Sequence, residues 1–163
     1  MKFSLLLIFS CFLLPSLSAK DPGMEAIGSM SVQLLFATDD DPKIAGALAK
    51  EVPSGEVKKL KAIEELKFSE YRLLGTDTPD ILKGYESWAT PLQPSKEILV
   101  SFQPIKRTDD GKVQMVLEYW QSKRKIFSTN PLLAKGRTLY LLGPEWRSGR
   151  LILAVRIEEL KAL

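Results

Sequence analysis

Apolar and polar residues alternate along much of the chain, and this pattern begins at Met30. The side chains of Met30, Val32, Leu34 and Phe36 fall on one face of an extended segment. A period of two is typical of a strand that buries one face. We therefore expect a strand over residues 30–37. Seven further strands are expected at residues 70–75, 84–91, 96–103, 112–120, 125–129, 137–142 and 151–157.

Turn residues separate these segments. Asp110-Gly111 lies between the strands at 96–103 and 112–120, and such a pair readily adopts the positive φ angles of tight hairpins. About eight strands joined by hairpin turns indicate a mainly β fold. We expect an antiparallel β-sandwich or open barrel with one packed amphipathic helix near the N-terminus.

A second pattern, with a period near three, predicts that helix over residues 54–66. Val57, Leu60, Ile63 and Leu66 lie on one side of it, and lysines and glutamates take the other side. Ser54 is suited to cap the N-terminus of the helix. Residues 139–142 and 151–155 are apolar on both faces, which indicates central strands, and the helix could cover one of them.

The first 19 residues are typical of an export leader. Lys2 is followed by about a dozen apolar residues and then by small residues that end at Ala19, as in a cleaved secretory signal peptide. The segment is shorter than the roughly 20 apolar residues of a spanning helix, and Pro15 interrupts it. Residues 20–29 hold two glycines and a proline, so we expect a flexible linker there. A single β-rich domain is expected over residues 30–163.

After the leader the chain has neither histidine nor cysteine. The whole sequence contains no histidine, and its one cysteine is Cys11. The exported part therefore lacks an imidazole base, a thiolate nucleophile, a disulfide, and histidine or cysteine metal ligands. We expect a non-catalytic protein without a cofactor. An exported domain without cysteine is more typical of a bacterial envelope than of a eukaryotic secretory pathway, so a periplasmic or extracellular location is expected.

The charge of the chain is nearly balanced. Lys+Arg number 23 and Asp+Glu number 20, for a net charge of +3. This balance does not favour nucleic acid as a partner. We expect membrane contact to be peripheral at most, and the protein to be a monomer or a weak oligomer.

Cations and aromatic side chains occur together in two places, and these are the candidate partner-binding residues. Tryptophan and arginine are enriched at interface hot spots, so the group could bind an envelope protein, a lipid headgroup or an anionic polymer in a salt-sensitive way. The alternative is that Trp120 covers the sheet edge under the helix, and that the cations only solvate a turn. The candidate residues are Trp120, Lys123, Arg124, Lys125, Trp146, Arg147 and Arg150.

Two segments carry a family resemblance. Residues 71–75, Tyr-Arg-Leu-Leu-Gly, and 149–155, Gly-Arg-Leu-Ile-Leu-Ala-Val, are similar to segments of small exported bacterial β-rich proteins of unknown function. In that group a leader, a helical stretch and a run of strands follow one another in this order. The resemblance spans most of the chain after the leader. It implies an envelope location and carries over no catalytic or ligand-binding residue.

Two other functions stay open. A carboxylate-dependent hydrolase needs only two acids, for which Asp77, Asp80, Glu86 and Glu118 are candidates. A small secreted inhibitor would present a projecting loop, for which residues 145–150 or 87–95 are candidates. We expect the binding or assembly-accessory role.

Overall fold

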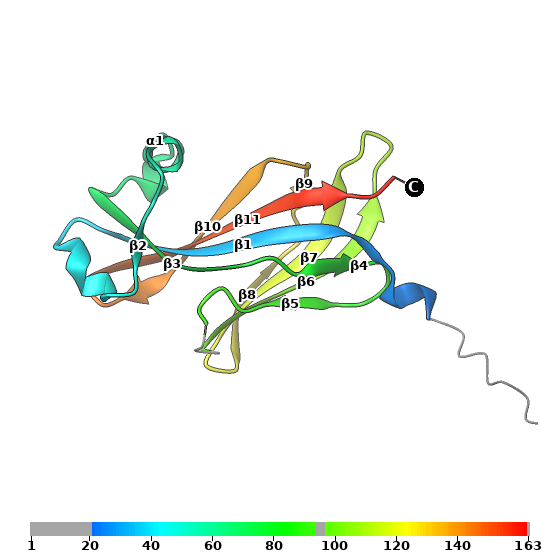
Figure 1. Ribbon diagram of the computed structural model, residues 1–163, viewed down its shortest axis with the longest axis horizontal. Coiled ribbons are helices and arrows are strands. Elements are labelled where there is room, and N and C mark those ends of the chain that lie inside the picture. Colours follow the sequence, from blue (N-terminus) through cyan, green and yellow to red (C-terminus); the bar gives the residue numbers. More distant parts are fainter. Residues whose placement is uncertain (1–20, 94–96, 163) are drawn as a thin grey trace, which may run out of the picture.

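The computed structural model describes residues 21–93 and 97–162 of the chain. These residues are mainly β and form two antiparallel sheets and one α-helix, without a closed barrel (Figure 1). The mainly β, antiparallel character that the sequence predicts is confirmed. The expected signal peptide at 1–19 lies outside the described residues. In the described part of the chain, no helix has the length and apolar character needed to cross a membrane.

The larger sheet has the strand order β10-β11-β1-β3-β2, and β4 also pairs with β1. Its long central pair runs from Gly28 opposite Leu160 to Ala37 opposite Arg150. Residues 26–29, which we expected in the linker, are the beginning of β1. The strands are β1 (Ala26–Thr38), β2 (Lys50–Glu51), β3 (Glu70–Asp77), β4 (Asp80–Leu82), β10 (Thr138–Trp146) and β11 (Gly149–Leu160).

The smaller sheet has the order β5-β6-β7-β8, and β9 also pairs with β7. The β6–β7 hairpin turns at Gly111, whose φ of 79° is the positive angle expected for the Asp-Gly pair. The strands are β5 (Ser87–Ala89), β6 (Ile98–Arg107), β7 (Val113–Gln121), β8 (Arg124–Thr129) and β9 (Leu132–Leu133).

The described residues contain eleven strands rather than about eight. Each of the eight segments expected from the sequence contains a strand. The additional ones are β2, β4 and β9, which are two or three residues long. A strand of that length is too short to show a period of two, so the pattern could not reveal it.

The main core lies between the two sheets. Met30, Val32 and Leu34 of β1 pack there in one cluster with the inward side chains of β6, β7 and β11. On β7 the residues at 113, 115, 117 and 119 are buried and those between them are partly exposed. Burying one such apolar side chain contributes about 1.5–3 kcal/mol. This core therefore fixes which face of each sheet points outward.

A second, smaller core covers part of the outer face of the larger sheet. Helix α1 (Ser54–Lys61) and the 3-10 turn η3 (Glu64–Leu66) place Leu60 and Leu66 in one cluster with Ile152 and Ala154 of β11. The α-helix is shorter than the expected 54–66, because Ile63 is extended, with φ −104° and ψ 119°. α1 lies on the side of the larger sheet away from β5–β8 (Figure 1).

Candidate functional site

The candidate binding residues are divided between the two sheets. Trp120 and Lys125 lie on β7 and β8 of the smaller sheet, whereas Trp146 and Arg150 lie on β10 and β11 of the larger sheet. Within the described residues, no ring contact or ion pair joins the two sets. The two sets therefore belong to two separate surfaces of the fold.

The β10–β11 set makes contacts that hold its own hairpin in place. The ring of Trp146 meets Phe36 edge-on, with centroids 5.4 Å apart, and packs against the main core. The guanidinium of Arg147 lies 4.1 Å from the centre of the Trp146 ring and donates to the carbonyl of Ile44. Arg150 forms an ion pair of 3.4 Å with Glu145. These contacts give the set a structural role.

The β7–β8 set lies on an outward face of the smaller sheet. Trp120 alternates with the buried Tyr119 and so points away from the main core. Its ring is 5.9 Å from that of Trp88, at an interplanar angle of 52°. Trp88, on β5, is 43% exposed. Because α1 packs on the other sheet, Trp120 does not lie under the helix.

Strand register explains why the two tryptophans meet. Trp88 pairs with Ser101 of β6, and Ser101 pairs in turn with Glu118 of β7, two positions before Trp120. Sequence reasoning missed Trp88 as a partner of Trp120 because no local pattern reveals a register across three strands. We call the group Trp88, Ser101, Glu118, Trp120 and Lys125 the tryptophan face.

Glu118 organises the polar side of the tryptophan face. Its carboxylate accepts hydrogen bonds from Trp120 Nε1 at 3.0 Å and from Lys125 Nζ at 2.9 Å. The Lys125 ammonium also lies 5.7 Å from the centre of the Trp120 ring. The hydrogen bond from Lys125 lowers the pKa of Glu118, and the Trp120 indole adds to this effect. A general acid needs a raised pKa, so Glu118 is unsuited to that role in a hydrolase.

The tryptophan face is flanked by the β7–β8 turn, which carries two further cations. Lys123 and Arg124 are exposed and form no ion pair with any other described residue. At the centre of the face, Ser101 is 1% exposed, and its buried hydroxyl has no hydrogen-bond partner in the described part of the chain. The face therefore combines two indole rings with one balanced ion pair, and the excess of positive charge lies in the flanking turn.

The remaining hydrolase candidates share no hydrogen bond with one another among the described residues. Asp77 accepts hydrogen bonds from the backbone N–H of Thr78 at 2.8 Å and of Thr90 at 2.7 Å, so it ties β3 to the segment after β5. Asp80 and Glu86 are exposed. Residues 21–93 and 97–162 contain no cluster of three or more metal-ligating side chains.

Of the two loops considered for an inhibitor, residues 145–150 form the tied β10–β11 turn, and part of 87–95 lies outside the described residues.

No protein-family model, curated protein or solved structure matched the chain.

Proposed function

We propose that the protein is an exported, non-catalytic binding module of the cell envelope, and that the tryptophan face holds an anionic polymer. The observation that carries this proposal is the contact between the exposed Trp88 and the half-buried Trp120, beside a turn whose Lys123 and Arg124 form no ion pair with a described residue. The envelope location rests on the leader expected at residues 1–19. On this proposal the two sheets form a β-sandwich that serves as the scaffold.

The tryptophan pair supplies the apolar part of the interface. Exposed apolar groups that cluster on a surface commonly mark interaction sites, and tryptophan is enriched at hot spots. Trp88 keeps 43% of its surface exposed although it contacts Trp120. Both rings are carried by strands of one sheet, so little order has to be gained on binding. A flat apolar unit, such as the face of a sugar ring, could pack on them.

The β7–β8 turn supplies the preference for negative charge. Lys125 is neutralised by Glu118, but Lys123 and Arg124 form no ion pair with a described residue. Glu97 lies opposite the turn, where its carbonyl accepts a hydrogen bond from the backbone N–H of Ser122, so the local charge is close to +1. At a rise of about 3.3 Å per residue, the turn lies roughly 7–10 Å from Trp120 along the strand. A partner that reaches both must extend over several units, which favours a polymer over a small ion.

The test is binding of the chain without its leader to a polyuronate, measured by calorimetry and by tryptophan fluorescence at low and high salt. Trp88→Ala and Trp120→Ala should each weaken binding by about thirtyfold, the effect of losing a hot spot worth about 2 kcal/mol. Binding should also weaken as salt rises. Tyr85→Ala is the matched control, because Tyr85 is an aromatic residue with 44% exposure outside the face.

Two further probes identify what is recognised. Dextran has sugar rings without charge, and polyglutamate has charge without sugar rings. We expect the polyuronate to bind more tightly than either. Equal affinity of the wild type, Trp88→Ala and Trp120→Ala for the polyuronate would refute the proposal, as would binding that salt does not change.

A further inference from the structure

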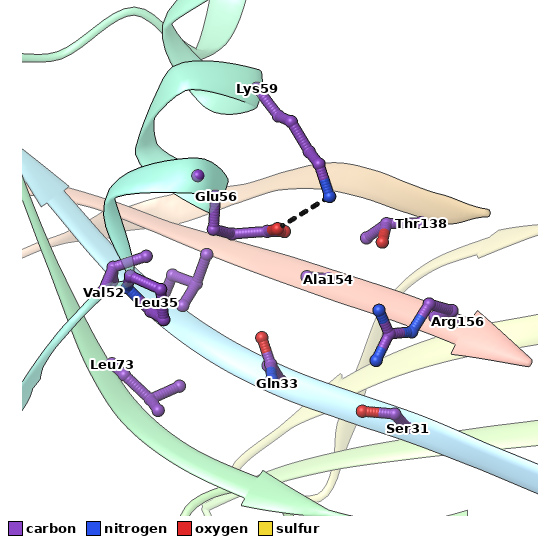
Figure 2. A pocket seen from close by; sticks show the side chains of 12 residues that line it. Ser31, Gln33, Leu35, Val52, Glu56, Lys59, Leu73, Thr138, Ala154 and Arg156 are labelled. Atoms are coloured by element: carbon purple, nitrogen blue, oxygen red, sulfur yellow. Dashed lines mark hydrogen bonds and ion pairs between the residues drawn. The ribbon is translucent and has the colours of Figure 1, made fainter. Parts of the chain in front are cut away.

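A pocket of about 340 Å³ opens between α1 and the outer face of the larger sheet (Figure 2). It lies where the outward positions of β1 change from apolar, at Leu35 under the helix, to polar, at Gln33 and Ser31. Its volume is at the lower end of the range of roughly 300–1,000 Å³ that is usual for small-molecule sites. The pocket is lined by residues of α1, β1, β3, β10 and β11 and by Val52, which lies between β2 and α1.

The pocket has two chemically different ends. Leu35, Val52 and Leu73 line one end, and Ser31, Gln33 and Arg156 line the other (Figure 2). The side chains of Ser31 and Gln33 make no hydrogen bond with another residue in the described ranges. They are therefore available to a bound molecule. A ligand that matches both ends must be amphiphilic.

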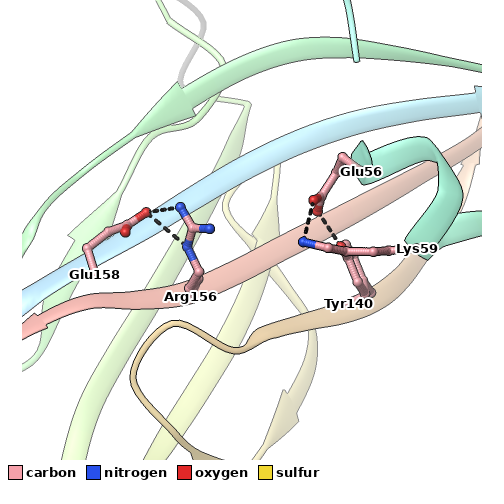
Figure 3. Close-up of polar contacts among 5 residues, drawn as sticks. All are labelled: Glu56, Lys59, Tyr140, Arg156 and Glu158. Atoms are coloured by element: carbon pink, nitrogen blue, oxygen red, sulfur yellow. Dashed lines mark hydrogen bonds and ion pairs between the residues drawn. The ribbon is translucent and has the colours of Figure 1, made fainter. Parts of the chain in front are cut away.

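Glu56, the acidic residue on the helix side of the pocket, already has hydrogen-bond partners. Glu56 of α1 accepts hydrogen bonds from Lys59 Nζ at 3.2 Å and from the hydroxyl of Tyr140 (Figure 3). Burial and the Glu56 carboxylate raise the pKa of Tyr140, so this hydroxyl keeps its proton and continues to donate. Glu56 is thereby held in place on the helix side of the pocket.

Arg156 is oriented by a residue outside the pocket. Its Nε, at 3.0 Å, and its Nη2 both donate to Glu158 Oε1. The third nitrogen, Nη1, donates to no described residue and lies on the side toward Glu56 and Lys59 (Figure 3). Glu158 does not line the pocket, so the charged lining residues are Glu56, Lys59 and Arg156. Their sum is +1.

We propose that this pocket binds a small amphiphilic monocarboxylate, with the carboxylate at Arg156 and Gln33 and the apolar end against Leu35, Val52 and Leu73. A guanidinium forms strong charge-assisted hydrogen bonds to a carboxylate, and Arg156 Nη1 and the Gln33 amide are donors that no described residue uses. The volume suits a short-chain acid and not a two-chain lipid. This site is separate from the tryptophan face and does not rest on the function proposed for it.

The test uses sodium octanoate as the probe, followed by amide chemical shifts in a titration of the folded protein. Saturable shifts should cluster on residues 31–35, 55–59 and 154–156. Octanol, which has the same chain without the charge, should bind at least tenfold more weakly. Octylammonium should not bind in the pocket, because its charge has the wrong sign.

Two variants that each remove one positive charge distinguish octanoate binding in the pocket from octanoate binding on the tryptophan face. Arg156→Gln should weaken octanoate binding at least tenfold, and Lys125→Gln, on the tryptophan face, should leave it unchanged. Gln33→Leu is a second pocket variant that leaves the Arg156–Glu158 pair intact, and it should also weaken binding. Shifts that cluster on the tryptophan face, shifts that do not saturate, or equal binding of octanoate and octanol would overturn the proposal.

Discussion

Replacing Lys123 with glycine should make the protein more stable and its binding to an anionic polymer weaker. The β7–β8 turn has two residues, Ser122 and Lys123, and both have positive φ, 48° and 64°. A two-residue hairpin of this kind matches the twist of its strands but favours glycine or asparagine. Neither is present here.

The size of the expected gain in stability follows from two opposing effects of the Lys123→Gly substitution. A side chain other than glycine in the left-handed region costs about 1–2 kcal/mol, because its Cβ approaches the following carbonyl oxygen. Glycine removes this cost but loses about 0.5–1 kcal/mol more backbone entropy on folding. Lys123 is exposed and forms no ion pair with a described residue, so no other folded-state contact is lost. The net expectation is a gain of about 0.5–1 kcal/mol, or about 2–4 °C in Tm.

Urea unfolding and thermal unfolding measure this gain, and Lys58→Gly is the matched control. Lys58 lies inside α1, so the same chemical change there should lower the free energy of unfolding by about 1 kcal/mol. Lys123→Gly should also weaken polyuronate binding and reduce its salt dependence, whereas Lys58→Gly should change neither. A loss of stability in Lys123→Gly would refute the strain argument. Unchanged salt dependence would remove Lys123 from the binding surface.

Three further outcomes follow from other parts of the fold. Leu60→Ala should lower the urea-derived free energy of unfolding by about 2–5 kcal/mol, because Leu60 is the buried residue of an eight-residue helix and packs in the cluster with Ile152 and Ala154. Tyr119→Phe keeps the stacked contact with Phe127 and removes a buried hydroxyl that has no partner in the described residues, so it should raise Tm by a few degrees, about 1 kcal/mol in stability. Hydrogen bonds from Lys112 and Thr108 lower the pKa of Asp110 to about 2. The stabilisation from this carboxylate should therefore be complete above pH about 4 and lost as pH falls toward 2, and a carboxyl NMR titration should show the midpoint move up in Lys112→Gln.

The alternation in the sequence predicts those strands that bury one face. β6 and β7 show it clearly, because one face of the smaller sheet packs in the main core and the other is exposed. β11 is apolar on both faces for a reason that the structure makes plain. Leu151 and Leu153 pack between the sheets, whereas Ile152 and Ala154 pack under α1.

The beginning of β1 could not be predicted from the sequence, because Gly28 is explained by a contact with a distant strand and not by its neighbours in the chain. We interpreted Gly28 as a linker residue. In the structure a Cβ at this position would lie 2.2 Å from the carbonyl oxygen of Glu159, so glycine permits β1 and β11 to approach closely. Composition alone cannot distinguish a glycine that loosens the chain from one that allows such an approach.

The same dependence on distant contacts limited how much of the candidate site could be predicted from the sequence. Trp120 and Trp146 have similar neighbours in the sequence, since each precedes a basic turn. The difference between them comes from distant residues: Trp146 meets Phe36 of β1, whereas Trp120 meets Trp88 of β5. The outward direction of Trp120 was predictable from alternation along β7. Its aromatic partner was not, because that contact depends on the register of β5, β6 and β7.

The two proposed sites lie on opposite sides of the main core, and this predicts that they act independently. The tryptophan face is on the outer side of the smaller sheet, and the pocket is on the outer side of the larger sheet. Coupling between them would require the closely packed layer between the sheets to have two arrangements, and a filled core resists such a change. Saturating octanoate should therefore leave the Kd for polyuronate unchanged in calorimetry. A shift of fivefold or more, about 1 kcal/mol of coupling, would show that the sheets move relative to one another on binding.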